Sequence, residues 1–145
     1  MKFVEFKLPC ELGKLFSTDY FISYVITDEK GFRIAFYHDV NDVYDIVFDF
    51  EYAVEDYRVS NEGRRFDHHT DKTPEQWLFI EVKDSEYLKK IDKESSGVLL
   101  AINPDLKHYI AGDVDYSIDI ISRREPKVYK AKRVSKKKVA IYDKK

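Results

Sequence analysis

Residues 43–54, VYDIVFDFEYAV, restrict the fold of this chain more than any other segment, because two kinds of side chain alternate along them. The apolar positions are Tyr44, Ile46, Phe48, Phe50 and Tyr52. The intervening positions are Asp45, Val47, Asp49 and Glu51. A period of two is typical of a β-strand that buries one face and exposes the other. We therefore expect a strand with its apolar face against a core and its acidic face toward solvent.

Other period-two and apolar runs predict a sheet around this strand. Residues 20–28 and 32–37 are joined by the short glycine-containing loop DEKG, a pattern typical of a β-hairpin. In the first strand of this hairpin, one face is expected to hold Tyr20, Ile22, Tyr24 and Ile26. In the second strand, the residues expected to point inward are Phe32, Ile34 and Phe36. A second hairpin is expected from 106–112 and 115–122, and further strands at 3–8, 56–60 and 77–82.

One segment, DSEYLKKIDKESSG (84–97), predicts a helix. Asp84 or Ser85 suits its N-cap, and Gly97 suits its end. A single helix among several short strands indicates the α+β class. We expect mainly an antiparallel β-sheet or sandwich with one helix near 85–95.

The net charge of −2 hides an uneven distribution of charge along the chain. Residues 123–145 hold 11 Lys or Arg and 2 acids, a balance of +9, whereas residues 1–122 hold 14 basic and 25 acidic side chains, a balance of −11. We therefore divide the chain into a single α+β domain over 1–125 and a basic C-terminal hairpin or tail over 126–145.

Three features of the sequence predict a cytoplasmic location. No apolar run approaches the roughly 18–20 residues that a membrane span needs. The first residues lack the basic start, apolar centre and cleavage site of a signal peptide. Cys10 is the single cysteine, which excludes an internal disulfide and is typical of a reducing compartment.

The segment 39–56 is acidic throughout and contains no Lys, Arg or His. Its acids are Asp39, Asp42, Asp45, Asp49, Glu51, Glu55 and Asp56. Like charges on one strand face repel each other, so cations must compensate them, either from the protein itself or from a basic partner. In the second case Asp45, Asp49 and Glu51 form the centre of a docking face, the other four acids form its rim, and Tyr57 supplies an aromatic anchor.

The histidine-containing segment RRFDHHTDKTPEQW (64–77) is interpreted as a solvated loop. Adjacent residues of an extended chain point in opposite directions, so His68 and His69 do not easily share one metal ion. The spacing of a zinc motif is absent as well. No metal or cofactor is therefore expected. A small metal- or histidine-dependent hydrolase stays open as an alternative if His38 or His108 converges on this segment.

The basic C-terminal segment leaves a second alternative open, a nucleic-acid-associated protein. Lys136, Lys137 and Lys138 are suited to phosphate contacts, and Tyr129 and Tyr142 to stacking on bases. The acidic body would repel the same polyanion, so nucleic acid is the less favoured partner.

Four pieces of the sequence carry a resemblance to known proteins. They are FEYAVEDYRVSNEGRR (50–65), FIEVKDSEYLKKIDKESSG (79–97), LKHYIAGDVDYSIDIIS (106–122) and REP (124–126). They lie in the run from Phe48 to Pro126, which covers about half of the chain and resembles short bacterial proteins of the toxin-immunity type. The resemblance implies neutralisation of a cognate toxin and assigns no catalytic residue. Immunity proteins against nucleases are frequently acidic because they cover a basic active site.

The sequence therefore favours a non-catalytic cytoplasmic binding protein whose partner is a basic protein. The specific hypothesis is an immunity protein that covers the basic active-site surface of a toxin, without membrane attachment and without a cofactor.

Overall fold

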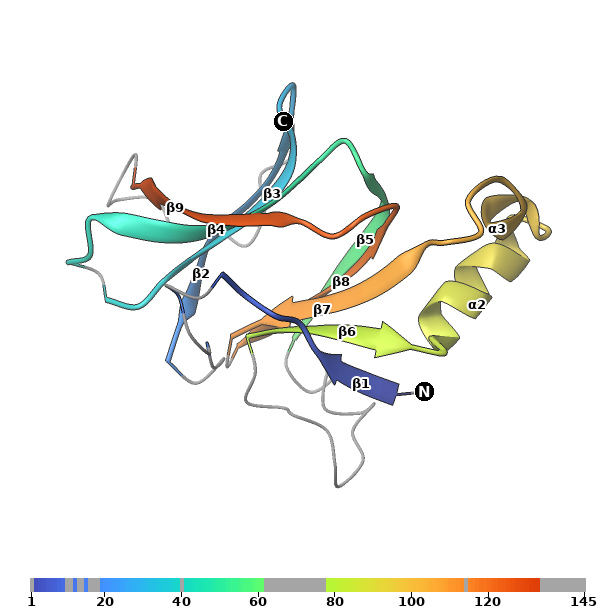
Figure 1. The fold of residues 1–145 in the computed structure, drawn as a ribbon, viewed down its shortest axis with the longest axis horizontal. Helices are drawn as coiled ribbons and strands as arrows, with labels where there is room; N and C mark the ends of the chain where they lie inside the picture. The colour runs from blue at the N-terminus through green and yellow to red at the C-terminus, as the bar shows by residue number, and fades with distance from the viewer. Residues whose placement is uncertain are drawn as a thin grey trace.

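The computed structural model describes residues 2–9, 12, 15, 19–39, 41–61, 78–113 and 115–133 of the chain. It contains two antiparallel sheets that share one core (Figure 1). The strands are β1 (Lys2–Glu5), β2 (Phe21–Asp28), β3 (Gly31–Tyr37), β4 (Tyr44–Glu51), β5 (Val54–Asn61), β6 (Phe79–Lys83), β7 (Lys107–Gly112), β8 (Tyr116–Ser122) and β9 (Lys127–Lys132). The helices are α2 (Glu86–Glu94) and α3 (Val98–Ile102).

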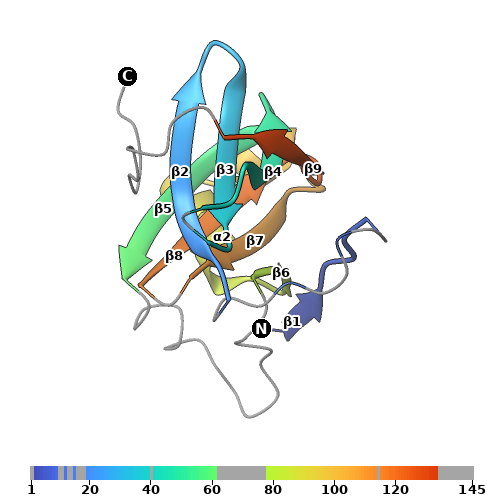
Figure 2. The ribbon, with the colours of Figure 1, turned by 90° about the vertical axis from the view of Figure 1, so that its left-hand side faces the viewer.

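The strand order is β1-β6-β7-β8-β5 in the larger sheet and β2-β3-β4-β9 in the smaller one. Neighbouring strands in both sheets pair antiparallel, and the strands of the two sheets cross at an angle (Figure 2). The two helices lie together at one end of the larger sheet, within the connection from β6 to β7 (Figure 1). The predicted class, α+β with mainly antiparallel sheet, is confirmed.

Aromatic rings of the two sheets meet in the core. Phe48 of β4 is fully buried and stacks on Phe79 of β6, with ring centroids 4.5 Å apart. Phe79 stacks in turn on Tyr109 of β7 at 5.1 Å. The alternation predicted for 43–54 is therefore confirmed in the middle of β4, while its two outermost apolar residues, Tyr44 and Tyr52, are 57% and 64% exposed.

The prediction for β2 is wrong after Ile22. A β-bulge shifts the register between Ile22 and Tyr24, so one extra residue stands in β2 opposite β3. An extra residue inverts the alternation of every side chain that follows it. Val25 consequently enters the core, and Tyr24 and Ile26 are only half-buried on the other face.

The predicted helix is confirmed as α2, but the structure contains a second helix that was not predicted. Ser85 caps α2, because its Oγ accepts a hydrogen bond from the Leu88 amide at 2.9 Å. Gly97 adopts a positive φ of 80° and starts a second short helix, α3, which the prediction of one helix omits. Within the described part of the chain, no helix has the length and apolar character needed to cross a membrane.

The basic C-terminal segment begins inside the domain. β9 pairs along β4 from Tyr44 opposite Lys132 to Asp49 opposite Lys127. The predicted boundary at 125/126 therefore falls just before a strand of the smaller sheet. Residues 138–143, the other half of the predicted terminal hairpin, and the histidine segment 64–77 lie outside the described residues.

The backbone conformation and the close approach of Glu51 require a glycine at position 31, at the start of β3. Its φ is 97°, and a Cβ added there would lie 2.0 Å from the carbonyl oxygen of Glu51. We expect Gly31→Ala to lower the free energy of unfolding by about 2–4 kcal/mol, because a left-handed alanine costs about 1–2 kcal/mol and the backbone must also move. Urea denaturation measures this loss.

Gly97→Ala is the matched control for Gly31→Ala. Gly97 also has a positive φ, but a Cβ there meets nothing within 4 Å. Its substitution should cost about 1 kcal/mol, from the backbone conformation alone. Equal losses at the two glycines would contradict the close approach of Gly31 to Glu51.

Candidate functional site

The predicted docking face must be corrected at its centre, because Asp45 is buried. Only 3% of its surface is exposed. Its carboxylate accepts hydrogen bonds from Arg133 Nε at 2.9 Å and from Ser23 Oγ at 3.2 Å. The Arg133 side chain is buried too, and its guanidinium lies 4.6 Å from the centroid of the Tyr37 ring. This ion pair holds β2, β4 and the end of β9 together and presents no charge to a partner.

Asp49 and Glu51 are engaged by residues of the C-terminal segment. The Tyr129 hydroxyl donates to Asp49 at 2.9 Å, and Glu51 pairs with Arg124 at 2.6 Å and Lys127 at 3.5 Å. Burial and the hydrogen bond to Asp49 raise the pKa of Tyr129 to about 12, so its phenol remains a donor at neutral pH. The negative charges of the acidic strand are therefore compensated by cations and donors of the protein itself, which is one of the two possibilities that the sequence left open.

Four predicted docking residues surround one pocket of about 310 Å³ next to the turn from β4 to β5. We call it the corner pocket and define it by Asp28, Phe32, Glu51, Tyr52, Glu55, Asp56 and Tyr57. Phe32 and Tyr57 give it an aromatic wall, with ring centroids 4.7 Å apart. Tyr52 adds a largely exposed ring. Carboxylates and aromatic rings therefore meet here on an accessible surface.

The carboxylates of the corner pocket differ in how far they are neutralised. Glu55 is paired with Arg123. Asp56 is exposed and accepts a hydrogen bond from the Tyr87 hydroxyl at 3.1 Å. No Lys or Arg of the described ranges forms an ion pair with Asp56. Asp56 is therefore the carboxylate best placed to meet a cation from outside.

Asp39 and Asp42 lie at the opposite end of β4 and do not join this pocket. β4 has eight residues, which separate its ends by roughly 23 Å. The Asp39 amide donates to the Asp42 carboxylate at 2.9 Å, and the Asn41 amide donates to the Asp39 carboxylate at 2.8 Å. The two acids thus stabilise the loop from β3 to β4. The predicted docking residues form two separate groups.

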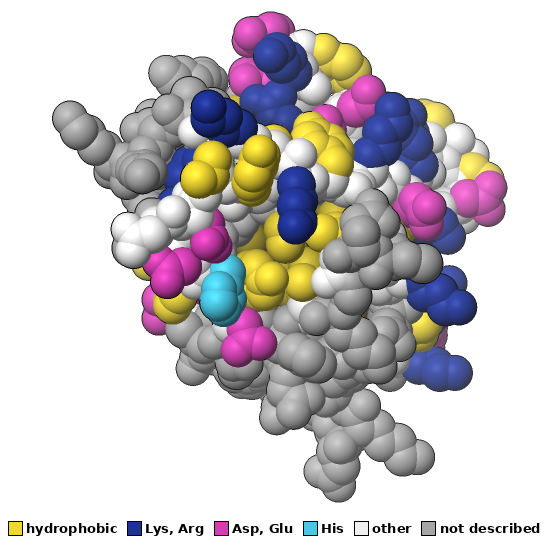
Figure 3. Space-filling view, turned by 60° about the vertical axis from the view of Figure 1, so that its left-hand side comes forward, with side chains coloured by type: hydrophobic (Ala, Val, Ile, Leu, Met, Phe, Trp, Pro, Cys, Tyr) yellow, Lys and Arg dark blue, Asp and Glu magenta, His cyan; other side chains and the backbone are white. Residues whose placement is uncertain are grey.

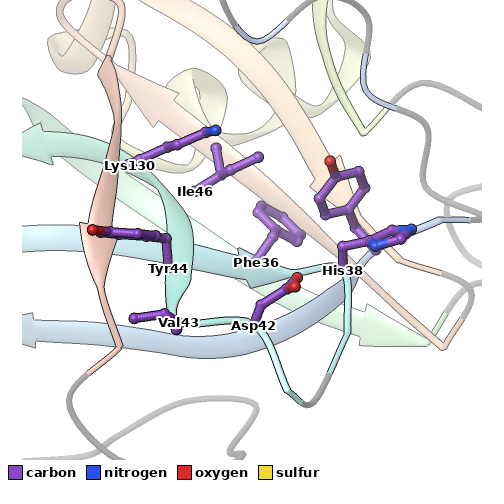
Figure 4. A pocket seen from close by; sticks show the side chains of 8 residues that line it. Phe36, His38, Asp42, Val43, Tyr44, Ile46 and Lys130 are labelled. Carbon is purple, nitrogen blue, oxygen red and sulfur yellow. The ribbon is translucent and has the colours of Figure 1, made fainter.

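A second pocket of about 340 Å³ lies at that end of β4. Its hydrophobic side chains show as a hollow beside a histidine and a lysine in Figure 3. Phe36 and Ile46 lie between Lys130 on one side and His38 on the other (Figure 4). The His38 ring also contacts Tyr20, with centroids 5.5 Å apart. Such a pocket is suited to a small group with an apolar body and a polar end.

A buried chain of hydrogen bonds joins α2 to β7, β8 and β5. Ser85 Oγ lies 2.7 Å from His108 Nδ1, and His108 Nε2 lies 2.8 Å from Asp119 Oδ1. Arg58 donates to the other Asp119 oxygen at 3.0 Å. Burial raises the pKa of Asp119, but the hydrogen bonds and charges of His108 and Arg58 outweigh it and hold that pKa below its ordinary value. Asp119 is therefore a carboxylate at neutral pH.

The described ranges contain no group of three metal-ligating side chains. His108 is buried in the network just described, and His38 lies exposed beside the second pocket. His68 and His69 lie outside the described residues. The two described histidines thus stand in different settings, His108 inside β7 and His38 just after the end of β3.

Sequence reasoning missed the association of Ser85, His108 and Asp119. Ser85 was expected as a helix cap and His108 as a strand residue, but each pattern was considered alone. One signal was present. Asp119 interrupts the apolar run IDII (118–121) in a strand that is buried from Ser117 to Ser122. A buried carboxylate needs a partner, which points to a nearby histidine or arginine.

Comparisons with protein-family models, with curated protein sequences and with solved structures find no match to this chain.

Proposed function

We propose that this protein is a cytoplasmic binding protein of the toxin-immunity type, and that it neutralises a basic toxin non-catalytically, by covering its active-site surface. The observation that supports the proposal is the corner pocket, where Glu55 and Asp56 are exposed beside the aromatic rings of Phe32, Tyr52 and Tyr57. Protein interfaces favour aromatic anchors, and acidic side chains beside them add complementarity to a basic partner.

The corner pocket is suited to one lysine or arginine side chain of a partner. The aliphatic stem would pack on the accessible rings of Tyr52 and Tyr57, and the charged head would reach the Asp56 carboxylate. Arg123 and Arg124 already pair with acids at the rim, but both are largely exposed. Exposed ion pairs contribute about 0–1 kcal/mol each, so a partner's cation can replace them at little cost.

The double variant Glu55→Lys/Asp56→Lys tests this proposal. We expect it to weaken binding of the basic partner at least about tenfold, because opposed like charges at an interface cost several kcal/mol. The measurement is affinity capture from the source cell, followed by titration of the captured protein. Reversal of Asp45 is unsuitable as a test of docking, since that residue is buried.

Glu94→Lys/Asp105→Lys is the matched control, with the same change of charge at two exposed positions outside the corner pocket. The control should retain the partner. The captured protein should also arrest growth when expressed alone and be neutralised by the wild-type protein. Equal capture by both double variants would refute the corner pocket as the docking site, and a harmless partner would refute the immunity role.

A further inference from the structure

We propose that Ser85 is an activated nucleophile that attacks small acyl-type electrophiles, with His108 as its general base and Asp119 positioning that base. Ser85 Oγ lies 2.7 Å from His108 Nδ1, and His108 Nε2 lies 2.8 Å from Asp119. A nucleophile, a base in hydrogen-bond reach and a third group that orients the base are the parts of a nucleophilic hydrolase site. This reactivity is independent of docking at the corner pocket.

The direction of the proton in this chain follows from Asp119. Its carboxylate is ionised and can only accept hydrogen bonds, so His108 Nε2 must carry a hydrogen and donate it. In the neutral imidazole, Nδ1 is then the unprotonated nitrogen. The Ser85 hydroxyl donates to it, which is the arrangement in which a histidine removes the proton of a serine. The ring nitrogens exchange the roles they have in chymotrypsin-like triads, where Nε2 faces the serine.

The start of α2 favours negative charge on Ser85 Oγ. The Leu88 amide donates to this oxygen at 2.9 Å, and the N-terminus of a helix carries partial positive charge. The first amides of a helix, here those of Glu86 and Tyr87, have no acceptor within the helix and are suited to an oxyanion. Asp84, which links β6 to this turn, adopts a φ of 53°, so the backbone is strained next to the serine.

A pocket of about 230 Å³ gives access to the pair, because both Ser85 and His108 line it. Lys83 and Lys107 also line it, and both approach Glu81, at 2.9 Å and 3.9 Å. The small volume and the charged lining select a short, polar acyl group over a lipid chain. Small esters are therefore the substrate class.

In the reaction, the Ser85 Oγ lone pair forms a bond to the ester carbonyl carbon while the hydroxyl proton passes to His108 Nδ1. The tetrahedral intermediate then breaks its bond to the leaving alkoxide, which takes the proton from Nδ1. Water repeats the two steps, releases the carboxylic acid and restores the serine. No oxidant, reductant or further reactant is needed.

The chain provides an internal comparison for this proposal. Ser95 also caps a helix, because its Oγ accepts from the Leu99 amide at 3.0 Å, but it donates to the Asp92 carbonyl at 2.8 Å and not to a histidine. Ser95 is also the more exposed of the two serines. If capping alone determined reactivity, Ser95 would react at least as fast as Ser85.

The test is labelling of the full chain with a small fluorophosphonate, located by peptide mass spectrometry. We expect one adduct at Ser85 and none at Ser95. His108→Gln should slow the labelling by roughly 10²–10⁴-fold, the usual contribution of a general base. Ser85→Ala should abolish the adduct and lower the catalysed release of p-nitrophenolate from p-nitrophenyl acetate toward the background rate.

Absence of an adduct at Ser85 in the wild-type chain, or equal rates at Ser85 and Ser95, would overturn the proposal. This comparison needs no variant, so it holds even if His108→Gln fails to fold. A folded His108→Gln chain that labels at the wild-type rate would overturn it as well, because the hydrogen bonds would then be structural only.

Discussion

Phe48→Ala is expected to lower the free energy of unfolding by about 3–5 kcal/mol, the usual cost of removing a fully buried phenylalanine. Phe48 has no exposed surface and stacks on Phe79 at 4.5 Å, with Phe36 edge-on at 5.7 Å. Because Phe48 belongs to the smaller sheet and Phe79 to the larger, the substitution opens a cavity between the sheets. The midpoint of urea denaturation measures the loss.

Tyr44→Ala is the control on the same strand and at the same parity. Tyr44 is 57% exposed, so its truncation removes little buried surface and should cost less than about 1 kcal/mol. A loss at Phe48 no larger than the loss at Tyr44 would contradict the shared core of the two sheets. Phe48→Leu should fall between the two, since most of the cavity stays filled.

Periodicity was sufficient to predict β4 but not β2. In β4 the irregularity in the pairing with β3 falls at the end of the strand, between Asp49 and Glu51, so the sequence pattern and the buried face coincide at Ile46, Phe48 and Phe50. In β2 a bulge near Ser23 inserts one residue, and the pattern of the sequence changes face there. Nothing in the local alternation marks a bulge, because its cause is pairing with another strand.

The second helix and the place of β9 also depend on contacts beyond the local sequence. The run VLLAI (98–102) is apolar and short, and such runs do not distinguish a strand from a helix. In the fold, the Leu99 amide donates to Ser95 and the Leu100 amide to Asp92, so the first helix supplies the capping groups of the second.

The charges of the candidate site show the same dependence on non-local pairing. The sequence revealed the acidic run 39–56 and the basic C-terminal segment, and predicted that opposite charges must meet. It did not reveal the register, which sets Lys127 opposite Asp49 and Ala131 opposite Asp45. Much of the acidic strand consequently stabilises the sheet, and the exposed acids that remain for a partner lie beyond its end, at Glu55 and Asp56.

Arg133→Met is expected to lower the free energy of unfolding by about 3–5 kcal/mol, because it leaves the buried carboxylate of Asp45 without its cation. The partners Ser23 and Tyr37 remain, but a hydroxyl and a ring do not replace a positive charge. Chemical denaturation near pH 7 measures the loss. Arg124→Met is the control, since its pair with Glu51 is exposed and should contribute less than about 1 kcal/mol.

The double variant Asp45→Leu/Arg133→Met separates the cost of a broken pair from the value of the pair itself. Replacing both partners with apolar side chains removes the charges together, so much of the stability lost in the single variant should return. Recovery would mean that the pair mainly specifies how β9 docks on β4. The opposite result is a loss of unfolding free energy in the double variant that equals the sum of the losses in Asp45→Leu and Arg133→Met. That result would show that the two charges do not interact, and it would contradict the buried ion pair.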